Sequence, residues 1–310
     1  MNPWPELAYP QWRETAATLQ LWTQMVGKIR LSLTPWLNHS WHVPFYITAR
    51  GLGSSPIPIG TELLEFEFDF VAQKLVCRAS TGVQRVIALA PQPIADFYAQ
   101  LMAMLADIGV TVAIDTLPSE IANAIRFTDD RVHVSYDPDA AHRFWRVLVQ
   151  ADRVFKLFRT GFLGKASPVH FFWGSFDLAV TRFSGRRAPP HPGGVPGLPD
   201  AVVREAYSHE VSSAGFWPGN DTFPEAAFYA YAYPEPPGFR DAAMPAGAHF
   251  ETALGEFVLP YATLRQAGEP DKLLLAFLDA TYVAAANAGN WDRGDLECVL
   301  GAVGKPRAIN

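Results

Sequence analysis

The sequence predicts an α+β fold made of two similar halves, each an antiparallel sheet with helices packed on it. Three observations lead to this prediction. A helix with an apolar stripe opens each half, several short strand segments follow it, and a further helix ends each half. Because the strands come in groups and do not alternate one by one with helices, we expect neither a Rossmann fold nor a TIM barrel.

In the first half, an amphipathic helix is expected from near Pro10 to near Gly27. Proline costs little at the start of a helix, where its missing N–H would have no partner. Spacings of three and four residues form one apolar stripe: Trp12, Ala16, Leu19, Trp22, Val26 and Ile29. The strands predicted after it are 42–50, 64–71, 74–80 and 83–89. A helix after Pro93 completes the half.

The segment 64–70 has the clearest strand pattern of the chain. Its sequence, LEFEFDF, alternates apolar side chains with carboxylates. Such strict alternation is typical of a half-buried antiparallel strand. Short turns at 72–73 and 81–82 connect it to the next strands, so this stretch is predicted to form a β-meander.

The second half repeats this order of elements. Asp137 and Pro138 provide a good N-cap and first position for a helix that ends near Gly161. The strands predicted after it are 169–183, 203–213, 226–233 and 250–259. A last helix begins near Pro270 and runs towards Gly289.

These patterns divide the chain into an N-terminal half (1–114), a polar connecting segment (115–136) and a C-terminal half (137–310). One local match supports an internal duplication. The sequences TARG at 48–51 and VTRF at 180–183 are each followed by a glycine and a pair of prolines. The same order of elements can also recur by chance, so both interpretations stay open.

Two proline-rich loops lie within the C-terminal half. Residues 186–200 hold five prolines and three glycines, and 233–247 forms a second loop of this kind. Such a content of Pro and Gly is incompatible with a helix or a central strand. Long ordered loops often cover a binding cleft, so we expect a cleft nearby.

Composition narrows the class of protein. The chain has 310 residues, 49% hydrophobic and 18% charged, with a formal net charge of −6. This excludes intrinsic disorder, and the acidic balance argues against nucleic acid as a partner. Two distant cysteines, Cys77 and Cys298, argue against a disulfide framework. Without a signal-peptide pattern or an apolar stretch long enough for a membrane span, we expect a cytoplasmic protein.

The segment 167–187, SPVHFFWGSFDLAVTRFSGRR, is the densest in polar and aromatic side chains. Read as one strand, its alternation separates His170 from Asp177. A buried carboxylate needs a partner, but Arg182 points to the opposite face, so a bulge at Gly174 or an arginine from elsewhere is required. Asp177 is then either functional or a member of a structural ion pair. The candidates here are His170 and Asp177 for catalysis and Trp173, Ser175 and Arg182 for ligand binding.

A second dense segment, 204–219, has the sequence REAYSHEVSSAGFWPG. Its candidates are His209 and Glu210 for catalysis and Ser212, Phe216 and Trp217 for ligand binding. Tyr231 joins them as a ligand-binding candidate, because tyrosines alternate with alanines over 229–233 and line one strand face. The alternative interpretation of these aromatic residues is ordinary core.

Two kinds of catalytic centre have their ingredients here. His170 and His209 with Glu210 or Asp177 match the composition of a two-histidine, one-carboxylate metal site, but they lack the fixed spacing of known metal motifs. A Ser-His-Asp hydrolase has its residue types, but the chain has no GxSxG elbow. No nucleotide or calcium motif is found either, so the sequence assigns no cofactor.

Several of these segments resemble a family of bacterial proteins known as a domain of unknown function. The resemblance lies in HFFWGSFDLAVTRFSGR, APPHPGG and YSHEVSSAGFWPG, and in PFYITARGL and the N-terminal WR…LWTQ. It covers nearly the whole chain and implies a single full-length family unit. It implies no activity and no catalytic residue.

Together these observations predict a soluble protein that binds a small molecule in an aromatic-lined cleft with a His/Asp/Glu/Arg polar cluster. Whether it is an enzyme stays open. The alternatives are a mononuclear metalloenzyme that uses His170 and His209, and a non-catalytic module that binds a partner protein. The identity of the ligand, the reaction and the oligomeric state are not assigned by the sequence.

Overall fold

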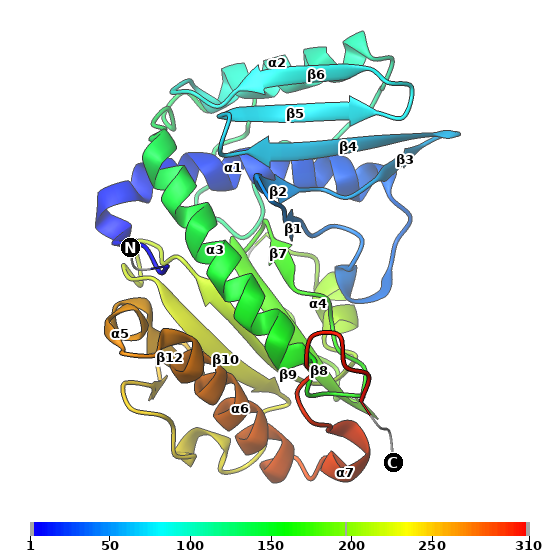
Figure 1. The fold of residues 1–310 in the computed structure, drawn as a ribbon. Helices are drawn as coiled ribbons and strands as arrows, with labels where there is room; N and C mark the ends of the chain where they lie inside the picture. The colour runs from blue at the N-terminus through cyan, green and yellow to red at the C-terminus, as the bar shows by residue number, and fades with distance from the viewer. Residues whose placement is uncertain (1–2, 196, 308–310) are drawn as a thin grey trace.

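Two six-stranded antiparallel sheets form the framework of the computed structural model, which describes residues 3–195 and 197–307 (Figure 1). The N-terminal sheet has the order β1-β2-β4-β5-β6, with β3 paired to β4. Its strands are β1 (Tyr46–Ile47), β2 (Gly51–Gly53), β3 (Ile57–Ile59), β4 (Glu62–Asp69), β5 (Lys74–Ala79) and β6 (Gln84–Ala88). The predicted α+β class and the meander of the first half are confirmed.

The C-terminal sheet has the order β11-β12-β10-β9-β8-β7. Its strands are β7 (His170–Phe172), β8 (Asp177–Arg187), β9 (His209–Trp217), β10 (Ala227–Tyr233), β11 (His249–Glu251) and β12 (Glu256–Pro260). All pairs of neighbouring strands in it are antiparallel. The strand orders of the two sheets differ, and the internal duplication stays a hypothesis.

Seven α-helices surround the sheets in the described part of the chain. They are α1 (Tyr9–Leu33), α2 (Ile94–Asp107), α3 (Pro138–Arg159), α4 (Asp200–Ala206), α5 (Tyr261–Gln266), α6 (Pro270–Ala288) and α7 (Arg293–Leu296). Short 3-10 helices η1 (Asn38–Ser40) and η2 (Phe239–Asp241) are added to these. The predicted N-cap is confirmed, since the Asp137 carboxylate accepts a hydrogen bond from Asp139 N at 2.9 Å.

The predicted end of the first helix near Gly27 is wrong. Helix α1 continues for six further residues to Leu33. Gly27 lies in mid-helix, and the Trp173 indole packs directly on it. A larger residue would not fit, since a Cβ at this position would lie 2.3 Å from Trp173 Nε1. The glycine therefore marks a close contact between α1 and the segment after β7, and does not mark a helix end.

Four strand predictions need correction. The segment 42–50 contains only β1, because the Thr48 hydroxyl accepts the N–H of Gly51 and turns the chain into β2. The segment 169–183 is a hairpin of β7 and β8, with Phe176 in the left-handed region at φ 60°. The segment 203–213 begins as helix α4, and 250–259 is the β11–β12 hairpin.

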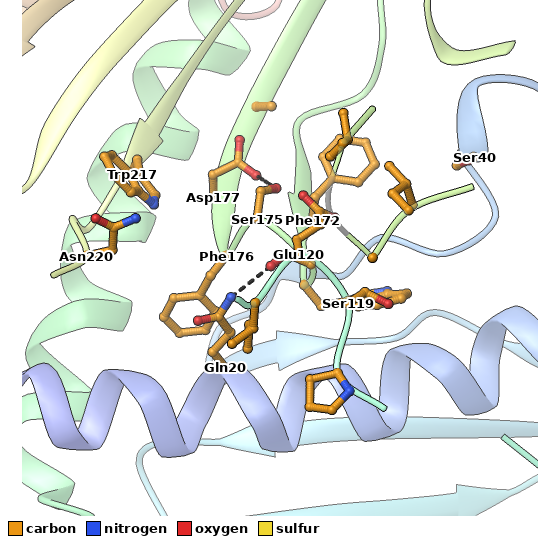
Figure 2. A pocket seen from close by; sticks show the side chains of 18 of the residues that line it. Gln20, Ser40, Ser119, Glu120, Phe172, Ser175, Phe176, Asp177, Trp217 and Asn220 are labelled. Carbon is orange, nitrogen blue, oxygen red and sulfur yellow. Dashed lines mark hydrogen bonds between the residues drawn. The ribbon is translucent and has the colours of Figure 1, made fainter. Parts of the chain in front are cut away.

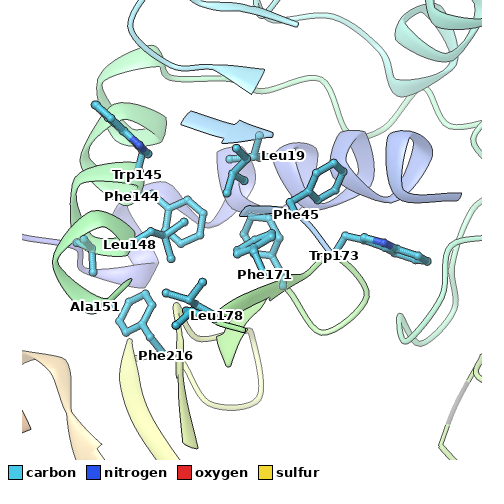
Figure 3. Packing of buried hydrophobic residues seen from close by; sticks show 14 of the residues in the cluster. Leu19, Phe45, Phe144, Trp145, Leu148, Ala151, Phe171, Trp173, Leu178 and Phe216 are labelled. Carbon is cyan, nitrogen blue, oxygen red and sulfur yellow. The ribbon is translucent and has the colours of Figure 1, made fainter. Parts of the chain in front are cut away.

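The two sheets meet at a buried contact between their edges. Phe45 and Phe171 exchange backbone hydrogen bonds of 2.9 Å as an isolated antiparallel bridge. Around it, Phe144 from α3, Leu178 from β8 and other apolar side chains form one cluster that continues into both halves (Figure 3). A single hydrophobic core thus includes residues from both predicted halves. The domain boundaries at 114 and 137 stay a prediction.

The two faces of the C-terminal sheet have different surroundings. On one face, the in-register residues Leu178, Phe216, Phe228 and Leu259 are fully buried beneath the layer of α3, α5 and α6 (Figure 1). Side chains alternate along a strand, so the intervening residues, among them Asp177 and Tyr229, point to the opposite face. That second face borders the cavity described below.

No helix within the described residues is long and apolar enough to cross a membrane.

Candidate ligand-binding cavity

A cavity of about 1330 Å³ lies against the second face of the C-terminal sheet (Figure 2). Its walls come from β8, β9, β10 and β12, from α1 and α4, and from several loops. One of these loops is part of the predicted connecting segment, and another includes residues 195 and 197–199 of the first proline-rich loop. Its most polar part, which we call the carboxyl–tyrosine cluster, consists of Glu120, Ser175, Asp177, Tyr207, Tyr229, Tyr231 and Glu256.

Asp177 begins β8 and is 6% exposed. Its carboxylate accepts hydrogen bonds from the hydroxyls of Ser175 and Tyr229, and Figure 2 shows the first of these. Burial raises the pKa of Asp177, against the opposite effect of the two hydroxyls. The sequence predicted that a bulge at Gly174 or an arginine from elsewhere would provide a partner for Asp177. Within the described residues no arginine pairs with Asp177, and two hydroxyl groups are its donors.

Tyr229 reaches Asp177 because a glycine lies between them. In the sheet register, Tyr229 on β10 faces Gly215 on β9, and Gly215 faces Ala179 on β8. A Cβ at Gly215 would lie 2.3 Å from the Tyr229 hydroxyl and 2.5 Å from the backbone oxygen of Leu178. Glycine at 215 therefore lets the ring cross β9 towards the neighbouring strand.

We expect Gly215→Ala to move the Tyr229 ring off Asp177 and to destabilise the protein by about 1–3 kcal/mol, as overpacking does elsewhere. Chemical unfolding measures the loss of stability. Gly268→Ala is a suitable control, since a Cβ at 268 meets no atom within 4 Å. Equal stability of the two variants would contradict the packing described here.

Glu120 enters the cavity from the connecting segment, with its backbone in the left-handed region at φ 59°. Reciprocal hydrogen bonds anchor the preceding residue to α1: Gln24 Nε2 donates to Ser119 O at 2.8 Å, and Ser119 N donates to Gln24 Oε1 at 2.7 Å. The carboxylate lies on Gly174, where a Cβ would be 2.0 Å from Glu120 Oε1. Burial, reinforced by the charge of Asp177, raises the pKa of Glu120 to about 7.

Glu256 is the first residue of β12 and faces the same cavity. Burial and the nearby charge of Asp177 raise its pKa to about 7 as well. Neither Glu256 nor Glu120 appeared among the sequence candidates. The available signal for Glu256 was a carboxylate next to the apolar run 257–259, and Glu120 gave none because it lies in a loop.

Three tyrosines complete the cluster. The rings of Tyr229 and Tyr231 are nearly parallel, with centroids 6.2 Å apart. The hydroxyls of Tyr207 and Tyr231 share a hydrogen bond of 2.8 Å. Burial raises the pKa of all three phenols, so they are neutral at physiological pH and remain hydrogen-bond donors.

An aromatic wall adjoins the cluster. Trp217 stacks on Phe223, with ring centroids 5.8 Å apart, and Phe172 and Phe176 also line the cavity (Figure 2). Trp173 also lines it, but its Nε1 donates to Val43 O at 3.1 Å and its ring lies on α1. The cavity thus combines apolar rings with convergent polar groups, as small-molecule sites do.

A family model described as a family of unknown function, DUF5996, matches residues 4–298. The chain belongs to the DUF5996 family. This confirms the family resemblance inferred from the sequence, and the match spans both sheets and the elements that line the cavity. No curated protein and no solved structure matches the chain.

Three of the predicted ligand-binding residues of this DUF5996 chain lie away from the cavity. Arg182 is 2% exposed on the helix-covered face, with its guanidinium 3.5 Å from the Phe158 ring and 4.4 Å from the Tyr282 ring. Phe216 and Ser212 point to that same face. Sheet alternation explains all three positions, since their neighbours in sequence face the cavity.

Four of the predicted ligand-binding residues do line the cavity. They are Trp173, Ser175, Trp217 and Tyr231.

The histidines predicted to act together are held in separate environments. His170 is 1% exposed and its ring contacts Trp41 and Tyr46, and neither of its nitrogens has a hydrogen-bond partner. Burial lowers the pKa of His170 to about 3, so the ring is neutral. The ring of His209 lies 6.2 Å from that of His39, and its Nδ1 shares a hydrogen bond with the Ser208 hydroxyl at 3.0 Å.

Glu210, the carboxylate of the alternative metal site, forms an ion pair of 2.7 Å with Arg186. Because side chains alternate along a strand, Glu210 lies on the opposite face of β9 from His209. Within residues 3–195 and 197–307, no group of three or more His, Cys, Asp or Glu side chains is placed to hold a metal ion. The described geometry thus gives the metalloenzyme alternative no ligand set.

Proposed function

We propose that this protein binds a small organic molecule in the cavity. The observation that carries the proposal is the convergence of one buried carboxyl group, Asp177, and two half-buried ones, Glu120 and Glu256, on one large aromatic-lined space. Buried carboxyl groups without cationic partners cost stability. Ionisable groups with strongly shifted pKa values cluster at binding and catalytic sites of proteins. Their presence here favours a binding role for this cavity.

The position of the tryptophans supports a cavity over a docking surface. The alternative of a protein-interaction module requires Trp173 and Trp217 on an exposed convex face. Trp173 is 8% exposed, and both residues line the cavity. Aromatic side chains in a concave site favour a ligand with an apolar or planar part.

A thermal-shift screen tests the proposal. The panel contains aromatic acids, aromatic amines, acyl chains and heterocycles. A ligand at 100 times its dissociation constant stabilises the folded state by about 2.7 kcal/mol, which raises the melting temperature. We expect at least one class to produce a saturable shift that Asp177→Asn removes.

His209→Ala provides the matched comparison, because His209 lies outside the lining of the cavity. This variant is expected to keep the shift, while Asp177→Asn remains folded and loses it. A screen in which no compound class shifts the melting temperature contradicts the proposal.

The same geometry favours a second candidate, general acid–base catalysis on the bound molecule. Glu120 and Glu256 each have a pKa of about 7, the range in which a carboxyl group can both give and take a proton at physiological pH. A ligand found in the screen is incubated with the protein and followed by mass spectrometry. Conversion that is lost in Glu120→Gln or Glu256→Gln supports catalysis, and an unchanged ligand argues for binding alone.

A further inference from the structure

We propose that the polar group of the ligand is an organic ammonium ion, bound by the carboxyl–tyrosine cluster. This inference rests on the proposed binding function and names the chemical class of the ligand. It follows from three features of the cavity: its uncompensated carboxyl groups, its lack of hydrogen-bond donors for two of them, and its aromatic rings.

The first feature is charge. No Lys, Arg or His in the described part of the chain forms an ion pair with Asp177, Glu120 or Glu256. Basic side chains do line the cavity, but they are engaged elsewhere. Lys28 Nζ donates to Leu117 O at 2.6 Å, and His39 Nδ1 donates to Ala206 O at 3.0 Å.

The remaining lining histidine is engaged in the same way, since His133 pairs with Asp130 at 2.7 Å. The three carboxyl groups therefore lack a counter-charge from the described residues. A ligand that brings a positive charge removes the cost of ionising them, whereas an anionic ligand increases it.

The second feature is the balance of donors and acceptors. Asp177 receives the hydroxyl protons of Ser175 and Tyr229. Glu120 and Glu256 line the cavity, and no described side chain or backbone group donates a hydrogen bond to either carboxylate. An ammonium group carries only donors, so it fits two carboxylates that offer only acceptors.

The third feature is the aromatic surface beside the carboxyl groups. The stacked rings of Tyr229 and Tyr231, together with Phe172 and Trp217, line the same space. The face of an aromatic ring attracts a cation, by about 0.5–1 kcal/mol at exposed sites and about 2 kcal/mol when desolvated. Such rings can bind the alkyl groups of an ammonium ion while the carboxylates accept its N–H groups.

A metal cation is the other way to supply positive charge. The described residues offer no group of three or more His, Cys, Asp or Glu side chains with the geometry of a metal site. Metal ions need several ligands close around one point, whereas an organic cation can contact carboxylates and rings spread along a wall. The arrangement therefore favours the organic cation.

The test compares three probes that share a phenyl ring and differ in charge: 2-phenylethylamine, 2-phenylethanol and 3-phenylpropionate. Isothermal titration at pH 8, where the amine is protonated, gives the affinity of each. A second pair, 1,4-diaminobutane and 1,4-butanediol, covers ligands without a ring. We expect each amine to bind at least about tenfold more tightly than its alcohol, the factor that one extra charge-assisted hydrogen bond provides.

Two variants and one control locate the effect. Glu120→Gln and Glu256→Gln keep the shape of the side chain and remove its charge, and each should reduce amine affinity about tenfold. Glu65→Gln makes the same change on β4 in the N-terminal sheet and should leave the affinity unchanged. Thermal unfolding of the same samples shows that all variants are folded.

The outcomes separate this inference from the proposed function. If the alcohol or the carboxylate binds as tightly as the amine, the cavity binds small molecules and the ammonium inference is wrong. The inference is also wrong if amines bind equally well to all three Glu→Gln variants. If no probe of any charge binds at up to about 10 mM, the ammonium inference is wrong, and the thermal-shift screen alone decides the proposed function.

Discussion

Replacing Glu256 with Gln is expected to stabilise the protein at pH 8 by about 1–3 kcal/mol and to change its stability little at pH 4.5. Burial raises the pKa of Glu256 from its ordinary value of 4.5 to about 7. Between these two values the folded protein retains a proton that the unfolded chain has released. The stability of the wild type therefore falls as pH rises through this window, and Gln removes that loss.

Urea unfolding at pH 4.5, 6 and 8 measures the effect. The difference in unfolding free energy between Glu256→Gln and wild type should grow from pH 4.5 to 7 and stay constant above it. Glu120→Gln should behave in the same way, because burial raises its pKa to about 7 too. Glu65→Gln on β4, outside the lining of the cavity, is measured beside them as the control for the substitution itself. A difference that is independent of pH would show that the pKa of Glu256 is not raised in the folded protein.

A double variant tests whether Glu120 and Glu256 also interact with each other. Asp177 raises the pKa of both Glu120 and Glu256, so the groups titrate as a coupled set. The double variant Glu120→Gln/Glu256→Gln is expected to gain less than the sum of the single variants if the carboxyls also repel each other. The cluster thus lowers stability at neutral pH, and a bound cation is one way to recover it.

The alternation of apolar and polar residues was sufficient to predict the strands that have one solvent-facing side. The alternation of 64–70 predicted β4, whose apolar residues Leu64, Phe66 and Phe68 are buried. The same rule placed Asp177 and Arg182 on opposite faces of their strand, and the structure has them there. In both cases the information lies within a few consecutive residues.

The carboxyl–tyrosine cluster was only partly predictable because it depends on distant segments. Asp177, Ser175 and Tyr231 are candidates from the sequence alone. Asp177 interrupts an apolar strand pattern, Ser175 lies two residues before it, and Tyr231 belongs to a tyrosine–alanine alternation. Glu120 reaches the cavity only because its loop is bound to α1 through Gln24 and packs on Gly174. Neither contact leaves a periodic signal in the sequence, and both are set by tertiary packing.

The candidates that lie away from the cavity have related causes. Phe216 and Arg182 are candidates because of their chemistry within dense segments, and the density of polar and aromatic residues does not indicate which sheet face is covered by helices. His170 is different: it lies on the other face of β7, where the rings of Trp41 and Tyr46 enclose it. Helices α3 and α6 bury one face, so an aromatic residue such as Phe216 becomes core while its neighbour Trp217 lines the cavity. The choice between these faces requires knowing how the helices pack.

Phe171→Ala is expected to destabilise the protein by about 3–5 kcal/mol, the usual cost of truncating a fully buried phenylalanine. The Phe171 ring is 0% exposed and contacts Phe144 and Phe176 at centroid distances of 6.2 and 5.3 Å. Its backbone forms the bridge to Phe45 between the two sheets. The cavity left by the ring would therefore lie where the halves meet (Figure 3).

This variant also tests whether the halves predicted at 1–114 and 137–310 unfold together. Because one apolar cluster continues through Phe45, Phe171 and Phe144, we expect a single transition that moves as a whole, with coincident curves from circular dichroism and tryptophan fluorescence. Phe250→Ala at the far edge strand β11, where the ring is only partly buried, should cost less. Two separated transitions in Phe171→Ala would show that each half folds on its own core and that the contact at Phe171 merely joins them.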